Sequence, residues 1–256
     1  MNRFEIVGTS GVGKSFLYKE LSKTPVTERN WFTLKEAYSF IALSATPGRL
    51  SNIILSYLLK SGITFGKDLG MSKTILDQEI KENYEYLDDF KNIIDYHMYY
   101  LQNQNELSVI SKIQYFNILI KKLNEIDFLK KNILKHVCID EGPVHKIFLD
   151  KNMLESFGKL SAQDPFFKNL KLIYLEKDPK LIFEQILERR RKGINNFSYR
   201  NLDNQQLRRK VEEHFYLYRN RIRILEEYNI EILYIDACEN LNRNLGRVNG
   251  FINSTV

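Results

Sequence analysis

Apolar positions follow two different periods along this chain. Short apolar runs, typical of buried strands, occupy residues 3–7, 136–140, 170–175 and 231–235, and residues 31–36 read as one more strand. Between them, apolar residues recur every three or four positions, which is the spacing of one helix face. Strands that alternate with helices favour a mostly parallel sheet covered on both faces. We therefore expect an α/β fold with about five parallel strands.

The helical segments divide this fold into parts. Helices are expected at 14–21, from Pro179, from about Asp203 and after Asp236, where Asp178 before Pro179 is a favourable start. Residues 39–134 show a long helical pattern, which we interpret as a cap over the carboxyl edge of the sheet that binds a substrate. Residues 188–202 end a helix in a polar stretch, which predicts a lid. We expect a single domain over residues 1–256.

Composition narrows the possible environments. Among the 256 residues no apolar run is long enough for a membrane span, and the first strand begins too early to leave room for a signal peptide. The two cysteines show no metal-ligand spacing, so a cytoplasmic location is expected. The net charge of +6 suits anionic ligands, although a solvated basic surface explains it equally well.

The glycine-rich segment after the first strand carries the clearest chemistry. Residues 8–15 read GTSGVGKS and match the G-x-x-x-x-G-K-[ST] pattern of a P-loop. Such a loop turns its backbone N–H groups and the start of the next helix toward phosphate groups. Lys14 would contact the β- and γ-phosphates of ATP, and Ser15 would bind Mg²⁺. The residues expected to bind the nucleotide are Gly8, Ser10, Gly11, Val12, Gly13, Lys14, Ser15 and Phe16. We therefore expect a three-layer P-loop NTPase fold.

Three further groups of polar residues are placed to act with this loop. Asp140 ends an apolar strand and would hold Mg²⁺, unless it only caps the following helix. Glu141 would orient or deprotonate a nucleophile, or simply end the strand. Glu36 would accept a proton from a substrate hydroxyl, or is a surface residue. The lid arginines Arg189, Arg190, Arg191 and Arg200 would neutralise transferring phosphate, or complement a helix end in water.

The order of these segments resembles the thymidylate kinase and deoxynucleoside kinase branch of the P-loop kinases. The matching blocks are residues 8–15, 172–179, 189–191 and 232–237. This resemblance implies a phosphotransferase that uses ATP and Mg²⁺, with a nucleoside or nucleotide as acceptor. Two features depart from that pattern. Asp140-Glu141-Gly142 stands where those kinases carry Asp-Arg, and the segment 39–134 is longer than their substrate region.

Other activities stay open at this level. A larger hydroxyl acceptor, such as a glycan, a lipid-linked sugar or a nucleic-acid end, would suit the long helical segment. A phosphate acceptor would need cations, and Arg49, Lys67 and Lys73 are candidates there. Asp140-Glu141 also resembles the second motif of hydrolytic ATPases, so an ATP-driven switch or motor is an alternative, as is a noncatalytic nucleotide sensor. Nucleic acid stays open as a partner although no motif indicates it, and a homodimer is an open alternative.

Overall fold

Five parallel strands form one central sheet. The computed structural model describes residues 1–44, 87, 89–147, 149–194, 199 and 201–254. The strands run in the order β2-β3-β1-β4-β5, and each neighbouring pair is parallel. The expected fold class is thereby confirmed, with the strand that precedes the P-loop at the centre of the sheet. The strands are β1 (Arg3–Val7), β2 (Trp31–Thr33), β3 (His136–Asp140), β4 (Leu170–Glu176) and β5 (Glu231–Asp236).

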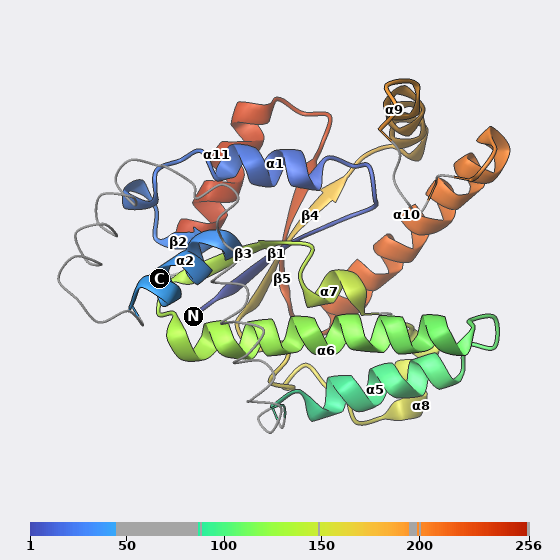
Figure 1. Ribbon diagram of the computed structural model, residues 1–256, viewed down its shortest axis with the longest axis horizontal. Coiled ribbons are helices and arrows are strands. Elements are labelled where there is room, and N and C mark those ends of the chain that lie inside the picture. Colours follow the sequence, from blue (N-terminus) through green and yellow to red (C-terminus); the bar gives the residue numbers. More distant parts are fainter. Residues whose placement is uncertain (45–86, 88, 148, 195–198, 200, 255–256) are drawn as a thin grey trace.

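Helices cover both faces of the sheet and form the outer two layers (Figure 1). One face carries α1 (Lys14–Leu21) and α11 (Leu241–Asn253), and α9 (Pro179–Arg191) adds to this side. The other face carries α6 (Val109–Asn132), with α5 (Lys91–Gln102) and α8 (Lys151–Phe157) packed outside it. The remaining helices are α2 (Leu34–Ser44), α7 (Pro143–Lys146), α10 (Asn204–Glu227) and a short 3₁₀ turn at Val26–Glu28.

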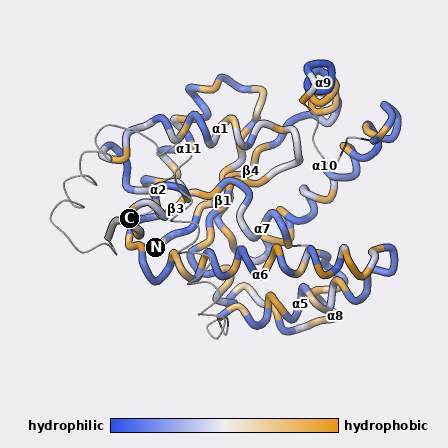
Figure 2. The backbone as a smooth tube through the Cα atoms, viewed as in Figure 1, coloured by the Kyte–Doolittle hydropathy of each residue, from blue (hydrophilic) through white to orange (hydrophobic). Residues whose placement is uncertain are grey.

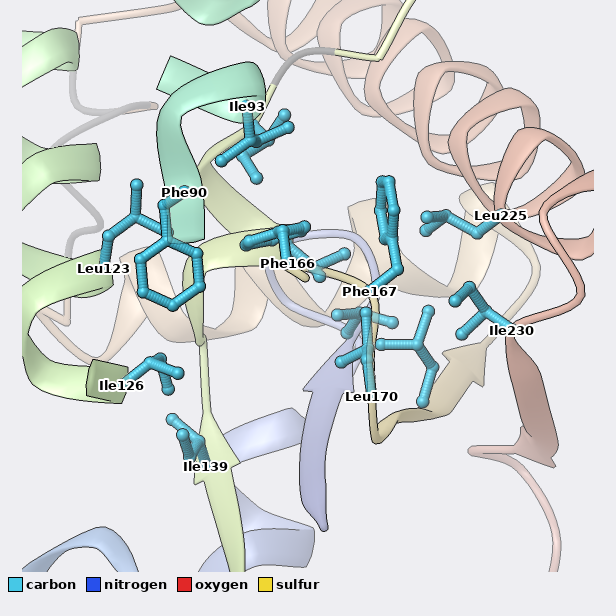
Figure 3. Close-up of a cluster of buried hydrophobic side chains, with 14 of the residues drawn as sticks. Phe90, Ile93, Leu123, Ile126, Ile139, Phe166, Phe167, Leu170, Leu225 and Ile230 are labelled. Carbon is cyan, nitrogen blue, oxygen red and sulfur yellow. The ribbon is translucent and has the colours of Figure 1, made fainter. Parts of the chain in front are cut away.

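Two buried hydrophobic clusters separate these layers. The cluster under α6 joins Leu123 and Ile126 to Ile139 of β3 and to the aromatic pair Phe166 and Phe167, as the close-up in Figure 3 shows. The opposite cluster joins residues of α1, α9 and α11 to the other face of the strands. In Figure 2 the central strands are accordingly among the most hydrophobic parts of the backbone. Burial on both faces explains why these strands read as continuous apolar runs.

Helix α10 connects the two faces. Leu207 and Val211 in its first half belong to the cluster beside α9, whereas Ile222 and Leu225 in its second half belong to the cluster under α6. The helix therefore crosses the carboxyl edge of the sheet, where the P-loop also lies. Its start is fixed by a capping box, in which Asp203 accepts from the backbone of Gln206 while the Gln206 side chain accepts from Asp203 N.

The prediction that one strand spans residues 31–36 was wrong in its second half. The strand ends at Thr33, and a helix begins at Leu34. The reason is a second capping box: Thr33 N donates to Glu36 Oε2 at 2.7 Å, and Glu36 N donates to Thr33 Oγ1 at 3.3 Å. Thr-x-x-Glu is a helix-start pattern, and here it outweighs the apolar run before it.

The long helical segment also differs from the expected arrangement. The described parts of residues 39–134 include α5 and α6, and α6 covers a face of the sheet through Leu119, Leu123 and Leu129. These residues therefore build a layer of the core and not only a cap at the carboxyl edge. Arg49, Lys67 and Lys73 lie outside the described residues, so a substrate-binding role for the segment stays a prediction. In the part of the chain that the structure describes, no helix is both long and apolar enough to cross a membrane.

Candidate active site

The P-loop connects β1 to α1 and leaves the start of that helix uncapped by any side chain. Gly13 is the N-cap residue with φ +114°, and Gly8 has φ +146°, both in regions that favour glycine. Side chains cap α6, α8, α9, α10 and α11, whereas α5 and α7 also begin without a side-chain cap but follow no glycine-rich loop. The first N–H groups of a helix carry partial positive charge and bind anions when no side chain satisfies them. This loop therefore has the geometry of a phosphate site.

Lys14 is buried at the mouth of the loop. Its ammonium donates to Gly8 O at 2.9 Å and to Thr9 O at 3.3 Å, and it lies 3.5 Å from Glu141 Oε1. Burial lowers the pKa of Lys14, while the carboxylates of Glu141 and Asp140 act in the opposite direction. A cation beside phosphate-binding N–H groups is suited to stabilise a triphosphate. Contact of Lys14 with the β- and γ-phosphates of ATP stays a prediction.

Asp140 and Ser15 fit a magnesium site. The Ser15 hydroxyl is hydrogen-bonded to the Asp140 carboxylate, whereas Asp140 Oδ1 is buried without a hydrogen-bond partner. Burial raises the pKa of Asp140, and the bond from Ser15 opposes that shift. A buried acceptor without a donor is costly unless a cation or water completes it. Mg²⁺ prefers such oxygen ligands, together with phosphate and water. Among the described residues, no cluster of three or more His, Cys, Asp or Glu side chains offers a different metal site.

The carboxylate of Glu141 lies close to three basic side chains. It adopts φ +57°, and its carboxylate lies 3.5 Å from Lys14 Nζ, 3.6 Å from His145 Nε2 and 3.5 Å from Lys146 Nζ. The side chain is 41% exposed, and the residue directly follows the carboxyl end of β3. A carboxylate at this place, next to the P-loop lysine, can orient a hydroxyl group or a water molecule for attack. The structure thus brings Glu141 together with Lys14, and a role of Glu141 toward a nucleophile stays a prediction.

Sequence reasoning missed the residues that close the site from α7 and α10. Tyr218 Oη lies 2.7 Å from His145 Nδ1, and Arg221 donates to the backbone oxygens of Val144 and His145 at 3.3 and 3.2 Å. Burial and the surrounding cations, Lys14 first among them, lower the pKa of His145 to about 2, which keeps it neutral. Only the crossing of α10 over the sheet edge makes these contacts, since more than seventy positions separate the partners.

Glu36 is engaged by neighbours of its own segment. Its Oε1 accepts from Arg29 at 2.5 Å, and its Oε2 accepts from Thr33 N and Thr33 Oγ1. Tyr18 of α1 accepts from Leu34 N at 3.0 Å and donates to Cys138 O at 3.3 Å, so it ties the start of α2 to β3. Glu36 therefore lies near the same edge as Asp140, but both of its oxygens already accept hydrogen bonds.

The lid arginines differ from one another in their surroundings. Arg189 and Arg191 are exposed, whereas Arg190 is half-buried and donates to Tyr199 O. Tyr199 is buried beside α9 and α10, is hydrogen-bonded to Ser10 of the P-loop, and lies 3.3 Å from His214 Nδ1. The structure thus links residues 190 and 199 to the P-loop. Arg200 lies outside the described residues, and contact of these arginines with phosphate stays a prediction.

Comparison with known proteins yields structural likenesses only. No protein-family model matches the sequence, and no curated protein matches it. Among solved structures, the chain is similar to a shikimate kinase from Bacteroides thetaiotaomicron, with 10% identity, a TM-score of 0.43 and 98% of each chain covered. It is similar to a gluconokinase from Sinorhizobium meliloti 1021, with 10% identity, a TM-score of 0.35, and 99% of this chain and 92% of that chain covered. A deoxyadenosine kinase from M. mycoides shows 14% identity and a TM-score of 0.44, with 98% of this chain and 99% of that chain covered. At such identities and TM-scores these likenesses carry no argument about activity, which rests on the residues described above.

Proposed function

We propose that this chain is a phosphotransferase that moves the γ-phosphoryl group of ATP to an acceptor, and that this acceptor is a hydroxyl or phosphate group of a nucleoside or nucleotide. The observation that carries this proposal is the cluster around the P-loop. Lys14 and Glu141 lie 3.5 Å apart, and the unpartnered Asp140 Oδ1 lies on the carboxylate that Ser15 binds. When bound, ATP supplies the phosphoryl group and Mg²⁺ neutralises its charge. The nucleoside class of acceptor follows from the family resemblance of the sequence.

Different residues of this chain would bind the triphosphate, the cation and the acceptor in such a transfer. The P-loop backbone and Lys14 bind and orient the triphosphate, and Ser15 and Asp140 supply ligands for the cation. Glu141 is the carboxylate best placed to orient the acceptor, because Glu36 already uses both oxygens on Arg29 and Thr33. Phosphoryl transfer depends mainly on positioning and charge stabilisation, so these roles account for the chemistry. The arginines at 189–191 would exclude water and neutralise developing charge.

An ATP-hydrolysing switch or motor is the second candidate. The observation that favours it is Glu141 itself, which directly follows the Mg²⁺-binding Asp140 and is only partly buried. A carboxylate in that position can orient water as readily as a hydroxyl group. A kinase hydrolyses ATP slowly without its acceptor, whereas an ATPase turns over alone or with a macromolecular partner.

One assay separates the two activities. The protein is incubated with Mg²⁺ and ATP labelled at the γ-phosphate, with a panel of nucleosides, nucleoside monophosphates, sugars and oligonucleotide ends. We expect label to appear on one acceptor class and little free phosphate without it. Lys14→Ala should lower this rate by about 100-fold or more while the protein stays folded, because a fixed charge-stabilising group is lost. Rapid release of free phosphate without any acceptor would favour the ATPase, and unchanged turnover in folded Lys14→Ala would refute both.

A further inference from the structure

A carboxylate is buried in the central strand, away from the open edge of the site. Glu5 of β1 is fully buried, and its Oε1 lies 2.9 Å from Arg3 Nε, close enough for an ion pair although the angle is not that of a hydrogen bond. Arg3 also donates to Phe166 O at 3.0 Å. Burial raises the pKa of Glu5, and Arg3 opposes that shift. A buried ion pair is weak evidence of stabilisation, because desolvation offsets most of the attraction. Its presence therefore calls for another explanation.

The second oxygen of Glu5 binds the segment that follows β3. Glu5 Oε2 accepts from Val144 N at 2.9 Å, at the start of α7. The N-cap residue of α7 is Gly142, which has no side chain to cap the helix. Glu5 thus supplies, from a different strand, the acceptor that a capping side chain would otherwise provide.

Gly142 packs directly on the Glu5 carboxyl group. A Cβ at position 142 would lie 2.3 Å from both Cδ and Oε2 of Glu5, so no side chain fits between them. From the other side, Arg221 of α10 binds the carbonyl oxygens of Val144 and His145. The segment 142–145 is therefore held at the N–H group of Val144 by Glu5 and at the C=O groups of residues 144 and 145 by Arg221.

Glu141 lies immediately before this fixed segment and has a conformation that needs such support. A residue other than glycine at φ +57° costs about 1 kcal/mol or more, and it persists only where its surroundings leave no alternative. In this conformation the Glu141 carboxylate lies close to Lys14. Asp140, the residue before it, is hydrogen-bonded to Ser15. The pairing of β3 with β1 also holds Asp140, whereas Glu141 lies between that strand and the segment that Glu5 contacts.

We propose that Glu5 is a positioning residue that, by holding Gly142 and Val144, sets Asp140 and Glu141 in place for magnesium and acceptor. This role rests on the proposed function. It predicts that disturbing Glu5 weakens the response to Mg²⁺ and the turnover of ATP, but leaves the P-loop able to bind ATP. Glu5 touches neither the loop nor the reacting groups, so it is not itself a catalytic residue.

Two substitutions disturb the contact from opposite sides. Glu5→Gln has one acceptor oxygen where Arg3 and Val144 N need two, so one of these donors faces an amide NH₂ group. Gly142→Ala leaves Glu5 and Arg3 intact and pushes the segment away through its added Cβ. Gly246→Ala is the matched control, since a Cβ there meets no atom within 4 Å on α11.

The measurement is the affinity for a fluorescent ATP analogue, with EDTA and with Mg²⁺, together with ATP turnover and the unfolding midpoint. In Glu5→Gln and Gly142→Ala we expect the affinity in EDTA to stay near that of the unsubstituted protein. The gain in affinity on adding Mg²⁺, and the turnover, should fall by about tenfold or more, as is usual when a supporting partner of a metal ligand is lost. Gly246→Ala should match the unsubstituted protein in every measurement.

The outcomes separate this inference from the proposed function. If the unsubstituted protein binds the analogue no better than Lys14→Ala, the proposed function fails. If binding depends on Lys14 but both Glu5→Gln and Gly142→Ala respond normally to Mg²⁺, the positioning role is overturned. If both variants lose ATP affinity equally with and without Mg²⁺, or fail to fold, the contact serves only the stability of the sheet, and the role is likewise rejected.

Discussion

A buried histidine should make the stability of this protein depend on acid. His97 lies on α5 with no exposed surface and is hydrogen-bonded to the backbone of Tyr115 on α6. Burial lowers its pKa from 6.5 to about 4, and the bond to Tyr115 opposes that shift only partly. The folded protein therefore keeps His97 neutral at a pH where the unfolded chain already binds a proton.

The sign and size of the effect follow from this difference. Above about pH 6.5 neither state binds the proton and stability is complete; as the pH falls toward about 4, the unfolded state alone gains it, so stability is lost. A shift of 2.5 pKa units (6.5 − 4) at about 1.36 kcal/mol each corresponds to about 3 kcal/mol. Below about pH 4 the folded state binds the proton too, and this contribution stays constant.

Urea unfolding between about pH 7 and about pH 4 measures the effect. We expect the free energy of unfolding of His97→Gln to fall less steeply over that range than that of the unsubstituted protein, by about 3 kcal/mol in total. His145 and the carboxyl groups titrate in both proteins, so the difference between the two curves isolates His97. Parallel curves for the two proteins would refute this reasoning, whatever their vertical offset.

Two further predictions concern the nucleotide site. Gly8→Ala should destabilise the protein by roughly 2–5 kcal/mol and abolish ATP binding, because its φ is positive and a Cβ would lie 2.5 Å from Leu175 O. In Gly13→Ala the added Cβ meets no atom within 4 Å, so this variant should lose only about 1–3 kcal/mol of unfolding free energy through its positive φ. If urea unfolding shows equal losses for Gly8→Ala and Gly13→Ala, the packing argument is contradicted. Alanine at any of positions 189–191 should lower turnover by about tenfold while changing ATP affinity little; normal rates in all three variants would show that these arginines only face solvent.

Local patterns in the sequence were sufficient for most elements of the sheet. The strand at 136–140 and the helix from Pro179 lie where their apolar run and their Asp-Pro start predict them, because neighbouring residues alone decide these features. The strand at 31–36 was predicted too long because the apolar run received more weight than the Thr33-x-x-Glu36 capping box. That signal was present in the sequence and could have been used.

The residues of the candidate site likewise fall into those that a local sequence pattern reveals and those that it does not. The P-loop, Lys14 and Asp140 could be named in advance as candidates, because a glycine-rich loop and a strand ending in a carboxylate are visible within a few residues, and their roles stay predictions. Glu5 could have been suspected, since Arg3 and Glu5 are charged residues within a buried strand. His145, Tyr218 and Arg221 could not, because nothing near them in the sequence shows that α10 crosses the sheet edge above α7.

The sequence by itself determined the class of the fold and the glycine-rich loop between β1 and α1, since periodicity, caps and glycine positions act over short distances along the chain. Tertiary structure alone decided which side chains surround that loop. The carboxyl edge of the parallel sheet brings residues 14, 141 and 218 together, although Lys14 and Tyr218 are about two hundred positions apart. The same packing turned α6 into a layer of the core, because its apolar face is buried against β3 and its neighbours. The packing of whole helix and sheet faces decides which residues far apart in the sequence come into contact. No local sequence pattern encodes these contacts.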